Sequence, residues 1–273
     1  MNPGERAEIE AFAKEIRKLT INMIGELGVG HIGGALSIAD VLAVLYGKHL
    51  KADPTDPRAA KRDRLVLSKG HAGPALYAAL ASRGFFPKEW LSTLNKGGSN
   101  LPSHCDRNRT PGIDMSTGSL GQGLSAACGM ALSLRIDGNP ATVFAIIGDG
   151  ESDEGQNWEA AMFAAHRKLS NLIAFTDFNN AQIDGTTEEI VSLGSLSAKW
   201  AAFGWNAVDV DGHDVAALDA AITAAKASKD KPTMIVMRTI KGKGCSFCEG
   251  MVSSHNMPVT REMAAEAIAA LGA

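Results

Sequence analysis

Asp149 and Asn179 are the residues of this chain best suited to metal chemistry. Each follows a short apolar run, 143–147 and 172–175, and one helix-length segment, 154–168, separates the two runs. Such a strand–helix–strand unit is nearly always parallel and right-handed, so both strands end at the same edge of the sheet. Open α/β sheets bind ligands at that edge. One carboxylate, one amide oxygen and nearby backbone carbonyls suit Mg²⁺, which completes its coordination with phosphate and water.

Glycines on both sides of Asp149 add a second chemical signal. Gly148 and Gly150 would let backbone N–H groups approach a phosphate closely. The same Gly-Asp-Gly sequence is also common in ordinary turns, where Asp and Gly are favoured for local reasons. These positions alone therefore leave two interpretations open, a structural turn and a metal–diphosphate site.

Four of the seven histidines lie in predicted loops beside Gly, Pro or Ser, and these are His31, His71, His104 and His255. Imidazoles in such loops suit a site that handles protons and phosphate oxygens. Each one alone is equally explained as a locally satisfied histidine, but four in similar settings favour a shared site. The other three are interpreted as structural, two in helices and one in a turn and helix cap: His49, His166 and His213.

Composition narrows the class of protein. Of the 273 residues, 45% are hydrophobic and 21% charged, which is typical of a folded globular protein. The net charge is −3 and no basic run exceeds two residues, so we expect no nucleic-acid partner. No apolar stretch approaches the length of a membrane span, and the charged N-terminal segment is unlike a signal peptide. We therefore expect no membrane partner and a cytoplasmic location.

The cysteines give a weaker signal. Cys245 and Cys248 form a single CxxC pair, and no second pair or His pair completes a zinc site. We interpret them as incidental thiols rather than as a redox pair.

Hydrophobic spacing predicts an alternation of helices and strands. The expected helices cover 8–27, 38–46, 73–82, 87–95, 121–136, 154–168, 193–203, 214–227 and 258–271. The expected strands cover 65–67, 143–147, 172–175, 206–210 and 233–239. Ser37 and Asp40 are interpreted as a capping box for the second helix, and the segment 96–120 as a long functional loop. We predict one domain over 1–273, a three-layer α/β sandwich with a mostly parallel sheet and an open strand order.

In this order, the motifs resemble the thiamine diphosphate-binding N-terminal part of transketolase. The resemblance covers nearly the whole chain. The matching segments are Gly30-His31-Ile-Gly-Gly-Ala-Leu-Ser37, Leu67-Ser-Lys-Gly-His71-Ala, Leu101-Pro-Ser-His104, Ser116-Thr-Gly118-Ser-Leu120-Gly-Gln-Gly123, Gly148-Asp149-Gly150-Glu-Ser-Asp-Glu154-Gly155 with Asn179 and Ile183-Asp184-Gly185, and Lys241-Gly-Lys-Gly244 with His255.

The resemblance implies two cofactors, thiamine diphosphate and Mg²⁺, and a role for each matching residue. The implied Mg²⁺ ligands are Asp149, Asn179 and the backbone carbonyl of Ala181. The implied contacts to thiamine diphosphate add Gly150, His71, His255, Gly118, Leu120, Ile183 and Glu154. The implied catalytic residues are the channel histidines His31, His71, His104 and His255, with Glu154 in a carboxylate relay across a subunit interface.

The chain departs from the family at three places. Cys105 stands where the family usually has Pro, Asn179 lies in an unusual metal loop with Asn180, and Ser254 and Asn256 replace the usual neighbours of the last histidine. Transketolases also continue with a pyrimidine-binding domain that carries the glutamate needed to activate thiamine. We therefore expect a split transketolase with an α₂β₂ assembly, in which that domain is a separate C-terminal subunit.

The resemblance implies transfer of a two-carbon ketol unit from a ketose, or ketose phosphate, to an aldose acceptor. Two alternatives share part of the pattern. One is a subunit of another thiamine enzyme, of the 2-oxo acid dehydrogenase or deoxyxylulose phosphate synthase type. The other is a non-catalytic homologue that binds the cofactor or a partner. The sequence leaves the sugars undetermined, and both the pentose phosphate pathway and a specialised sugar pathway are compatible with it.

Overall fold

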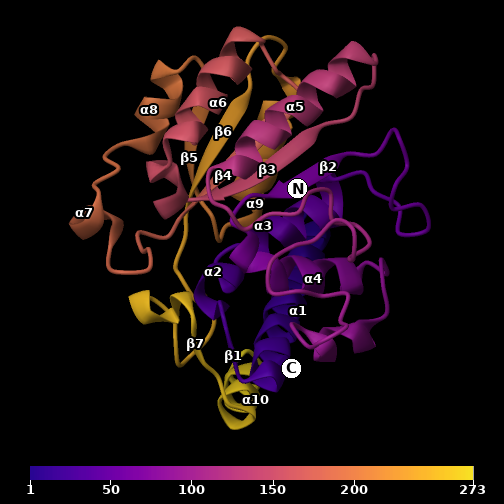
Figure 1. Ribbon diagram of the computed structural model, residues 1–273, viewed down its shortest axis with the longest axis vertical. Helices are drawn as coiled ribbons and strands as arrows, with labels where there is room; N and C mark the ends of the chain where they lie inside the picture. Colours follow the sequence, from indigo (N-terminus) through magenta and orange to yellow (C-terminus); the bar gives the residue numbers. More distant parts are fainter. Residues whose placement is uncertain (273) are drawn as a thin grey trace.

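A five-stranded parallel sheet forms the centre of the protein in the computed structural model, which describes residues 1–272 (Figure 1). The strand order, which the sequence left open, is β2-β3-β4-β6-β5. The strands are β2 (Arg64–Leu67), β3 (Val143–Gly148), β4 (Leu172–Phe178), β6 (Thr233–Arg238) and β5 (Asn206–Asp211). The predicted α/β class, the parallel pairing and all five predicted sheet strands are confirmed.

Alternating side chains divide the core into two layers. In β3, Phe144 and Ile146 pack on one face of the sheet, while Ala145 and Ile147 pack on the other. This is the pattern of a strand buried on both faces. The first face is covered by α1 (Pro3–Leu27), α3 (Ala39–Val44), α4 (Gly73–Ser82) and α9 (Val215–Ala227). The second is covered by α5 (Gln122–Ile136), α6 (Gly155–His166) and α8 (Leu196–Ala202) (Figure 1). The result is the predicted three-layer sandwich.

Helix α1 begins five residues before the predicted start. Asn2 and Glu5 form a capping box, and Pro3 occupies the first turn. These are local start signals that lie outside the hydrophobic pattern. The helix ends as predicted at Gly28, which has a left-handed backbone with φ of 93°.

The predicted helix 38–46 is wrong in detail, and so is its capping box. The chain forms α2 (Ile32–Leu36), then α3, then a π-helical turn over Leu45–His49. The Ser37 hydroxyl donates to Asp177 instead of capping α3, and Asp40 pairs with Arg17. Both polar side chains are buried, so partners distant in the sequence take the place of the local cap.

Short elements are the other differences from the predicted pattern. The segment predicted as helix 87–95 is a 3₁₀ helix over Lys88–Thr93. The one-turn helix α7 (Thr187–Ile190) and the antiparallel pair β1 (Val29–Gly30) and β7 (Met257–Pro258) were not predicted, because two to four residues carry no periodicity. The last helix, α10 (Arg261–Ala270), packs against α1. The segment 96–120 has no helix or strand, as predicted.

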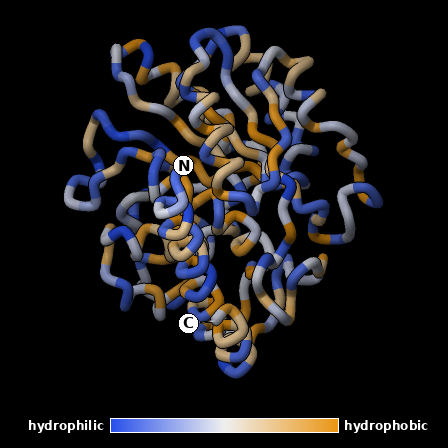
Figure 2. The backbone as a smooth tube through the Cα atoms, turned by 180° about the vertical axis from the view of Figure 1, so that it is seen from behind, coloured by the Kyte–Doolittle hydropathy of each residue, from blue (hydrophilic) through white to orange (hydrophobic). Residues whose placement is uncertain are grey.

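Hydrophobic segments concentrate in the central strands and hydrophilic ones in the outer loops (Figure 2). Within residues 1–272, the helices include none with the length and apolar character of a membrane span.

Candidate functional site

Strands β3 and β4 bring the predicted metal residues to one edge of the sheet. Gly148 is paired in register with Asp177, and the Asp149 N–H donates to the Asp177 carbonyl at 3.2 Å. Asp149 and the loop that carries Asn179 therefore leave the sheet side by side. The predicted convergence of the two strand ends is confirmed.

Asp149 presents a carboxylate oxygen without a partner. Its Oδ1 accepts a hydrogen bond from the Gly150 N–H at 2.9 Å, whereas Oδ2 is buried and has no hydrogen-bond partner within residues 1–272. Burial, and then the nearby Asp177, raise the pKa of Asp149 to about 6. A buried carboxylate in this state is stabilised by an added cation, so Asp149 fits the predicted role of a Mg²⁺ ligand.

The two other predicted metal ligands lie in the loop after β4. The Asn179 Oδ1 accepts from the Ala181 N–H at 3.2 Å, and the Ala181 carbonyl accepts from the Lys241 Nζ at 3.2 Å. Lys241 is buried, and burial together with Lys69 lowers its pKa to about 8. A cation thus already contacts one of the oxygens that the sequence assigns to the metal. The oxygen donors are of the hard type that Mg²⁺ prefers.

A buried ion pair behind these ligands was not identified from the sequence. Lys69 and Asp177 are almost fully buried and form a salt bridge. The Asp177 carboxylate also accepts from the Ser37 hydroxyl at 2.7 Å and from the Asn179 amide at 3.0 Å. Burial opposes ionisation of Asp177, but Lys69 and the hydrogen bonds outweigh it and leave its pKa below the usual value. Asp177 therefore orients Asn179 as a charged residue.

The four loop histidines converge on one point. The ring centroid of His31 lies 5.4 Å from that of His71, 5.6 Å from that of His104 and 5.4 Å from that of His255. The centroids of His71 and His255 are 5.0 Å apart. The β1–β7 pair explains part of this arrangement, since it joins the chain directly next to His31 and His255. The predicted shared histidine cluster is present, and His255 belongs to it despite its unusual neighbours.

All four imidazoles are held in the neutral form. Burial is the main cause of a lowered pKa in each, and nearby Lys69 or Lys241 adds to it for three of the rings. The pKa of His71 lies well below the usual value, and that of His255 falls to about 4. Neutral rings can both accept and donate protons at neutral pH, which is the property that general acid–base chemistry needs.

The predicted glycine loop lines a groove beside His104. This cavity, of about 630 Å³, includes His104, Gly118 and Gln122 in its lining. Gly118 has a φ of 149°, and a Cβ there would come within 3.2 Å of the His104 ring. A Cβ on Gly150 would come within 2.9 Å of the Gln182 Cβ. Both glycines therefore allow close backbone approach at the positions assigned to the cofactor.

Glu151 is a second residue that the sequence interpretation missed. Its buried carboxylate accepts from the Ser68 hydroxyl, from the Gly121 N–H at 2.9 Å and from the Gly148 N–H at 3.1 Å. It thereby joins the glycine loop, the second histidine loop and the end of β3. Its place beside Asp149 in the motif was the only available signal, because its partners lie far away in the sequence.

Two predicted cofactor residues face outward from this chain. Glu154 is exposed at the start of α6, and Ile183 is 66% exposed. Leu120 is half-buried next to the glycine turn. The outward position of Glu154 suits its predicted role at a subunit interface, which stays a prediction.

The remaining histidines and the cysteine pair lie outside the cluster. His49 is buried against Asp219, at 2.6 Å, and His166 is exposed. His213 lies in the predicted turn, but the cap of α9 is Asp214; the His213 ring accepts from the Ile240 N–H at 2.9 Å. Cys245 and Cys248 are free and fully buried. Residues 1–272 contain no group of three or more His, Cys, Asp or Glu placed to hold a metal ion, which agrees with incidental thiols.

A parallel sheet with one carboxylate, buried lysines and four imidazoles at its carboxyl edge defines a domain that binds a metal–diphosphate cofactor. Residues 9–273 match the family described as "Transketolase, thiamine diphosphate binding domain". The chain belongs to this family and is a subunit of a thiamine diphosphate-dependent transketolase.

Similar proteins include two transketolase subunits of matching length. The "6-deoxy-6-sulfo-D-fructose transketolase subunit SqwG" of Clostridium sp. (strain MSTE9) is 58% identical over 98% of this chain and 97% of its own length. An apulose-4-phosphate transketolase subunit of Phocaeicola vulgatus is 38% identical over 95% and 92%. The solved transketolase from Leishmania mexicana superposes with a TM-score of 0.90 at 33% identity, covering 97% of this chain. This chain spans 41% of that structure.

Proposed function

We propose that this chain is the diphosphate- and Mg²⁺-binding subunit of a split transketolase and acts with a separate pyrimidine-binding subunit. The observation that carries the proposal is the placement of the unpartnered Asp149 oxygen at the strand edge that also gathers the four neutral histidines. Relatives of matching length that are named as subunits support the split arrangement. We propose an α₂β₂ assembly.

The chain's residues divide into a cofactor set and a substrate set. Asp149, Asn179 and the Ala181 carbonyl would hold Mg²⁺, and the Gly150 N–H would contact the diphosphate. Lys241 would neutralise diphosphate charge from the other side of the loop. Thiamine diphosphate, when bound, supplies the carbon nucleophile that accepts the two-carbon unit.

The histidine cluster would perform the proton transfers on the sugar. Cleavage of the C2–C3 bond of a ketose requires removal of the C3 hydroxyl proton, and an imidazole nitrogen accepts such a proton only when it is neutral. His31, His104 and His255 meet this condition because burial lowers the pKa of each ring. Return of that proton to the acceptor completes the transfer of the ketol unit.

A sulfonated ketose is the favoured donor. The relative with 58% identity is named for 6-deoxy-6-sulfo-D-fructose, whereas the relatives named for apulose 4-phosphate are 37–38% identical. Removal of C1 and C2 from the sulfonated hexulose leaves a four-carbon aldose that keeps the sulfonate. Apulose 4-phosphate is the second candidate donor.

The test uses the chain mixed with its candidate C-terminal subunit, Mg²⁺ and thiamine diphosphate. Each candidate ketose is supplied with an aldose acceptor, and the shortened aldose is followed by mass spectrometry. We expect His104→Ala to lower kcat by about 100-fold or more while leaving cofactor affinity unchanged. The exposed His166→Ala serves as the matched control. Cofactor binding without ketol transfer from any ketose would contradict the proposal.

A further inference from the structure

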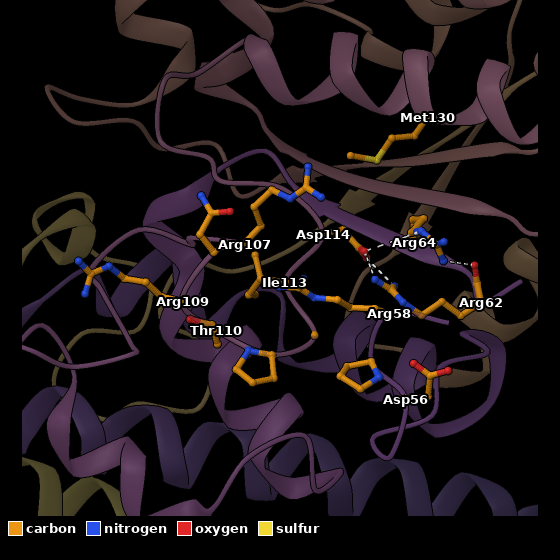
Figure 3. Close-up of a pocket in the computed structure, with 14 residues that line it drawn as sticks. Asp56, Arg58, Arg62, Arg64, Arg107, Arg109, Thr110, Ile113, Asp114 and Met130 are labelled. Atoms are coloured by element: carbon orange, nitrogen blue, oxygen red, sulfur yellow. Dashed lines mark hydrogen bonds and ion pairs between the residues drawn. The ribbon is translucent and has the colours of Figure 1, made fainter. Parts of the chain in front are cut away.

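A second cavity lies at the opposite end of β2 from the histidine cluster. The site described above follows the carboxyl end of this strand, whereas the cavity opens at its first residue, Arg64. Its volume is about 630 Å³. Five of the residues that line it are arginines (Figure 3): Arg58, Arg62, Arg64, Arg107 and Arg109. Such a concentration of guanidinium groups contrasts with a chain whose net charge is −3.

Carboxylates neutralise only part of this charge. Asp114 is the buried acidic residue of the cavity, and it pairs with Arg62 (Figure 3) and accepts from the Leu65 N–H at 2.8 Å. Arg64 donates to backbone carbonyls, and its pKa is lowered by burial and then by Arg62. The charge of Arg62 is therefore compensated by Asp114, and the remaining cations of the cavity repel each other.

Arg58 and Arg107 are the two guanidinium groups left available. Both are exposed, and within residues 1–272 neither side chain forms an ion pair or a hydrogen bond. They come from two different loops, 53–60 and 96–120, that face each other across the cavity. Arg109 is partly engaged, because its Nε lies 3.7 Å from Asp106. The charged wall thus contains two forked donors of the kind that bind oxyanions in a bidentate way.

The rest of the lining is apolar and shaped by proline. Pro57, Pro111, Ile113 and Met130 contribute to the same cavity. The volume lies within the usual range for small-molecule sites. A wall of guanidinium groups combined with an apolar floor suits a small organic molecule that carries a charged tetrahedral group.

We propose that this cavity binds a small organic phosphate monoester or sulfonate, with Arg58 and Arg107 holding the oxyanion. The site is separate from the cofactor site, but the two share one loop. The Ser116 hydroxyl oxygen accepts from the Arg107 N–H at 3.1 Å, and Ser116 lines the groove beside His104. An anion held by Arg107 therefore lies against the same loop segment as the cofactor groove.

The test is calorimetric titration of the chain with three anions at fixed ionic strength. The probes are sorbitol 6-phosphate, 2-hydroxyethanesulfonate and inorganic phosphate, with sorbitol as the neutral control. Sorbitol 6-phosphate has no carbonyl group and cannot be a ketol donor or acceptor. Each titration is made with and without saturating thiamine diphosphate and Mg²⁺. The proposal predicts saturable binding of an organic anion, tighter than that of inorganic phosphate, with or without the cofactor.

The matched variants remove the same charge at different places. Arg58→Ala/Arg107→Ala keeps the Arg62–Asp114 pair and should raise the Kd of the organic anion at least about tenfold. Arg6→Ala/Arg261→Ala removes two exposed arginines of α1 and α10 and should leave the Kd unchanged. The organic anion that binds more tightly identifies the source as phosphate ester or sulfonate. Equal affinity in the Arg58/Arg107 variant, preference for inorganic phosphate, or competition with the cofactor would overturn the proposal.

Discussion

At the scale of single residues, the site is organised around charge that awaits a cation. Asp149 and Asp177 are buried close enough for Asp177 to raise the pKa of Asp149. Lys69 neutralises Asp177, whereas the Asp149 Oδ2 has no partner within residues 1–272. An ionised carboxylate in this position is costly without a counter-charge. The resulting arrangement favours a divalent cation at Asp149 over an empty site.

Replacement of Asp149 tests this interpretation directly. We expect Asp149→Ala to weaken Mg²⁺-dependent binding of thiamine diphosphate by about tenfold or more. The metal-free variant should be at least as stable as the parent, because a desolvated carboxylate is removed. Calorimetric titration gives the affinity, and Asp153→Ala, which removes an exposed carboxylate of the same motif, is the control. Equal cofactor affinity in the parent and Asp149→Ala would refute the metal assignment.

The histidine cluster predicts a loss of stability in acid. The pKa of His255 is about 4 in the folded protein, below the value of about 6.5 expected when it is unfolded. Between these values the unfolded chain binds the extra proton, so the free energy of unfolding falls as pH drops from about 6.5 toward 4. His255→Gln should reduce this fall, and the exposed His166→Gln should not. Urea unfolding at pH 7 and pH 4.5 measures the difference, and identical pH dependence in all three proteins would contradict it.

Residue types and their loop settings were sufficient to predict Asp149, Asn179 and the four histidines as neighbours. They were insufficient for the supporting residues. The hydrogen bond from Ser37 to Asp177 spans 140 positions and the Lys69–Asp177 pair spans 108. Such pairs form only after the sheet and its covering helices have placed distant loops together, and no local pattern in a single sequence encodes them.

At the scale of elements, Glu151 fixes three segments that carry the site. Its carboxylate accepts from groups on the second histidine loop, the glycine loop and β3. Glu151→Ala would leave the Ser68 hydroxyl and the Gly121 and Gly148 N–H groups without this acceptor. We expect a loss of at least about 2 kcal/mol in the free energy of unfolding, and faster hydrogen exchange at Gly121.

The control for this prediction is Glu159→Ala, which removes an exposed glutamate of α6. Urea unfolding and hydrogen exchange are measured on both variants. A loss of stability without faster exchange at Gly121 would show that Glu151 stabilises the fold without holding the glycine loop.

Long elements with regular spacing were predictable, and short ones were not. The helices α4, α5 and α9 and the five sheet strands lie close to their predicted ranges because many buried residues repeat at one period. The region 32–49 breaks into three pieces because its residues are buried on all sides. With no exposed face, the hydrophobic pattern carries no phase from which boundaries can be read.

At the scale of the whole molecule, one edge of the sheet combines the cofactor residues with exposed apolar side chains. Ile183, Ile190 and Val191 are 66%, 43% and 53% exposed and follow directly after the metal loop. Exposed apolar groups that gather beside a functional site are typical of an interaction surface. This chain also spans only 41% of the solved Leishmania mexicana transketolase. We therefore expect the pyrimidine-binding subunit to cover this edge.

We accordingly predict that the chain alone binds thiamine diphosphate and Mg²⁺ but does not turn over sugar. Activation of thiamine requires the glutamate that the resemblance places in the pyrimidine-binding subunit. Adding that subunit should restore ketol transfer. Ile190→Asp should raise the Kd between the two proteins at least about tenfold, because a charge would be buried at the contact. The control is Ile136→Asp, at the exposed far end of α5. Full turnover by the purified chain without its partner would sink the assignment to a split enzyme, and equal affinity for the partner in both variants would place the contact elsewhere.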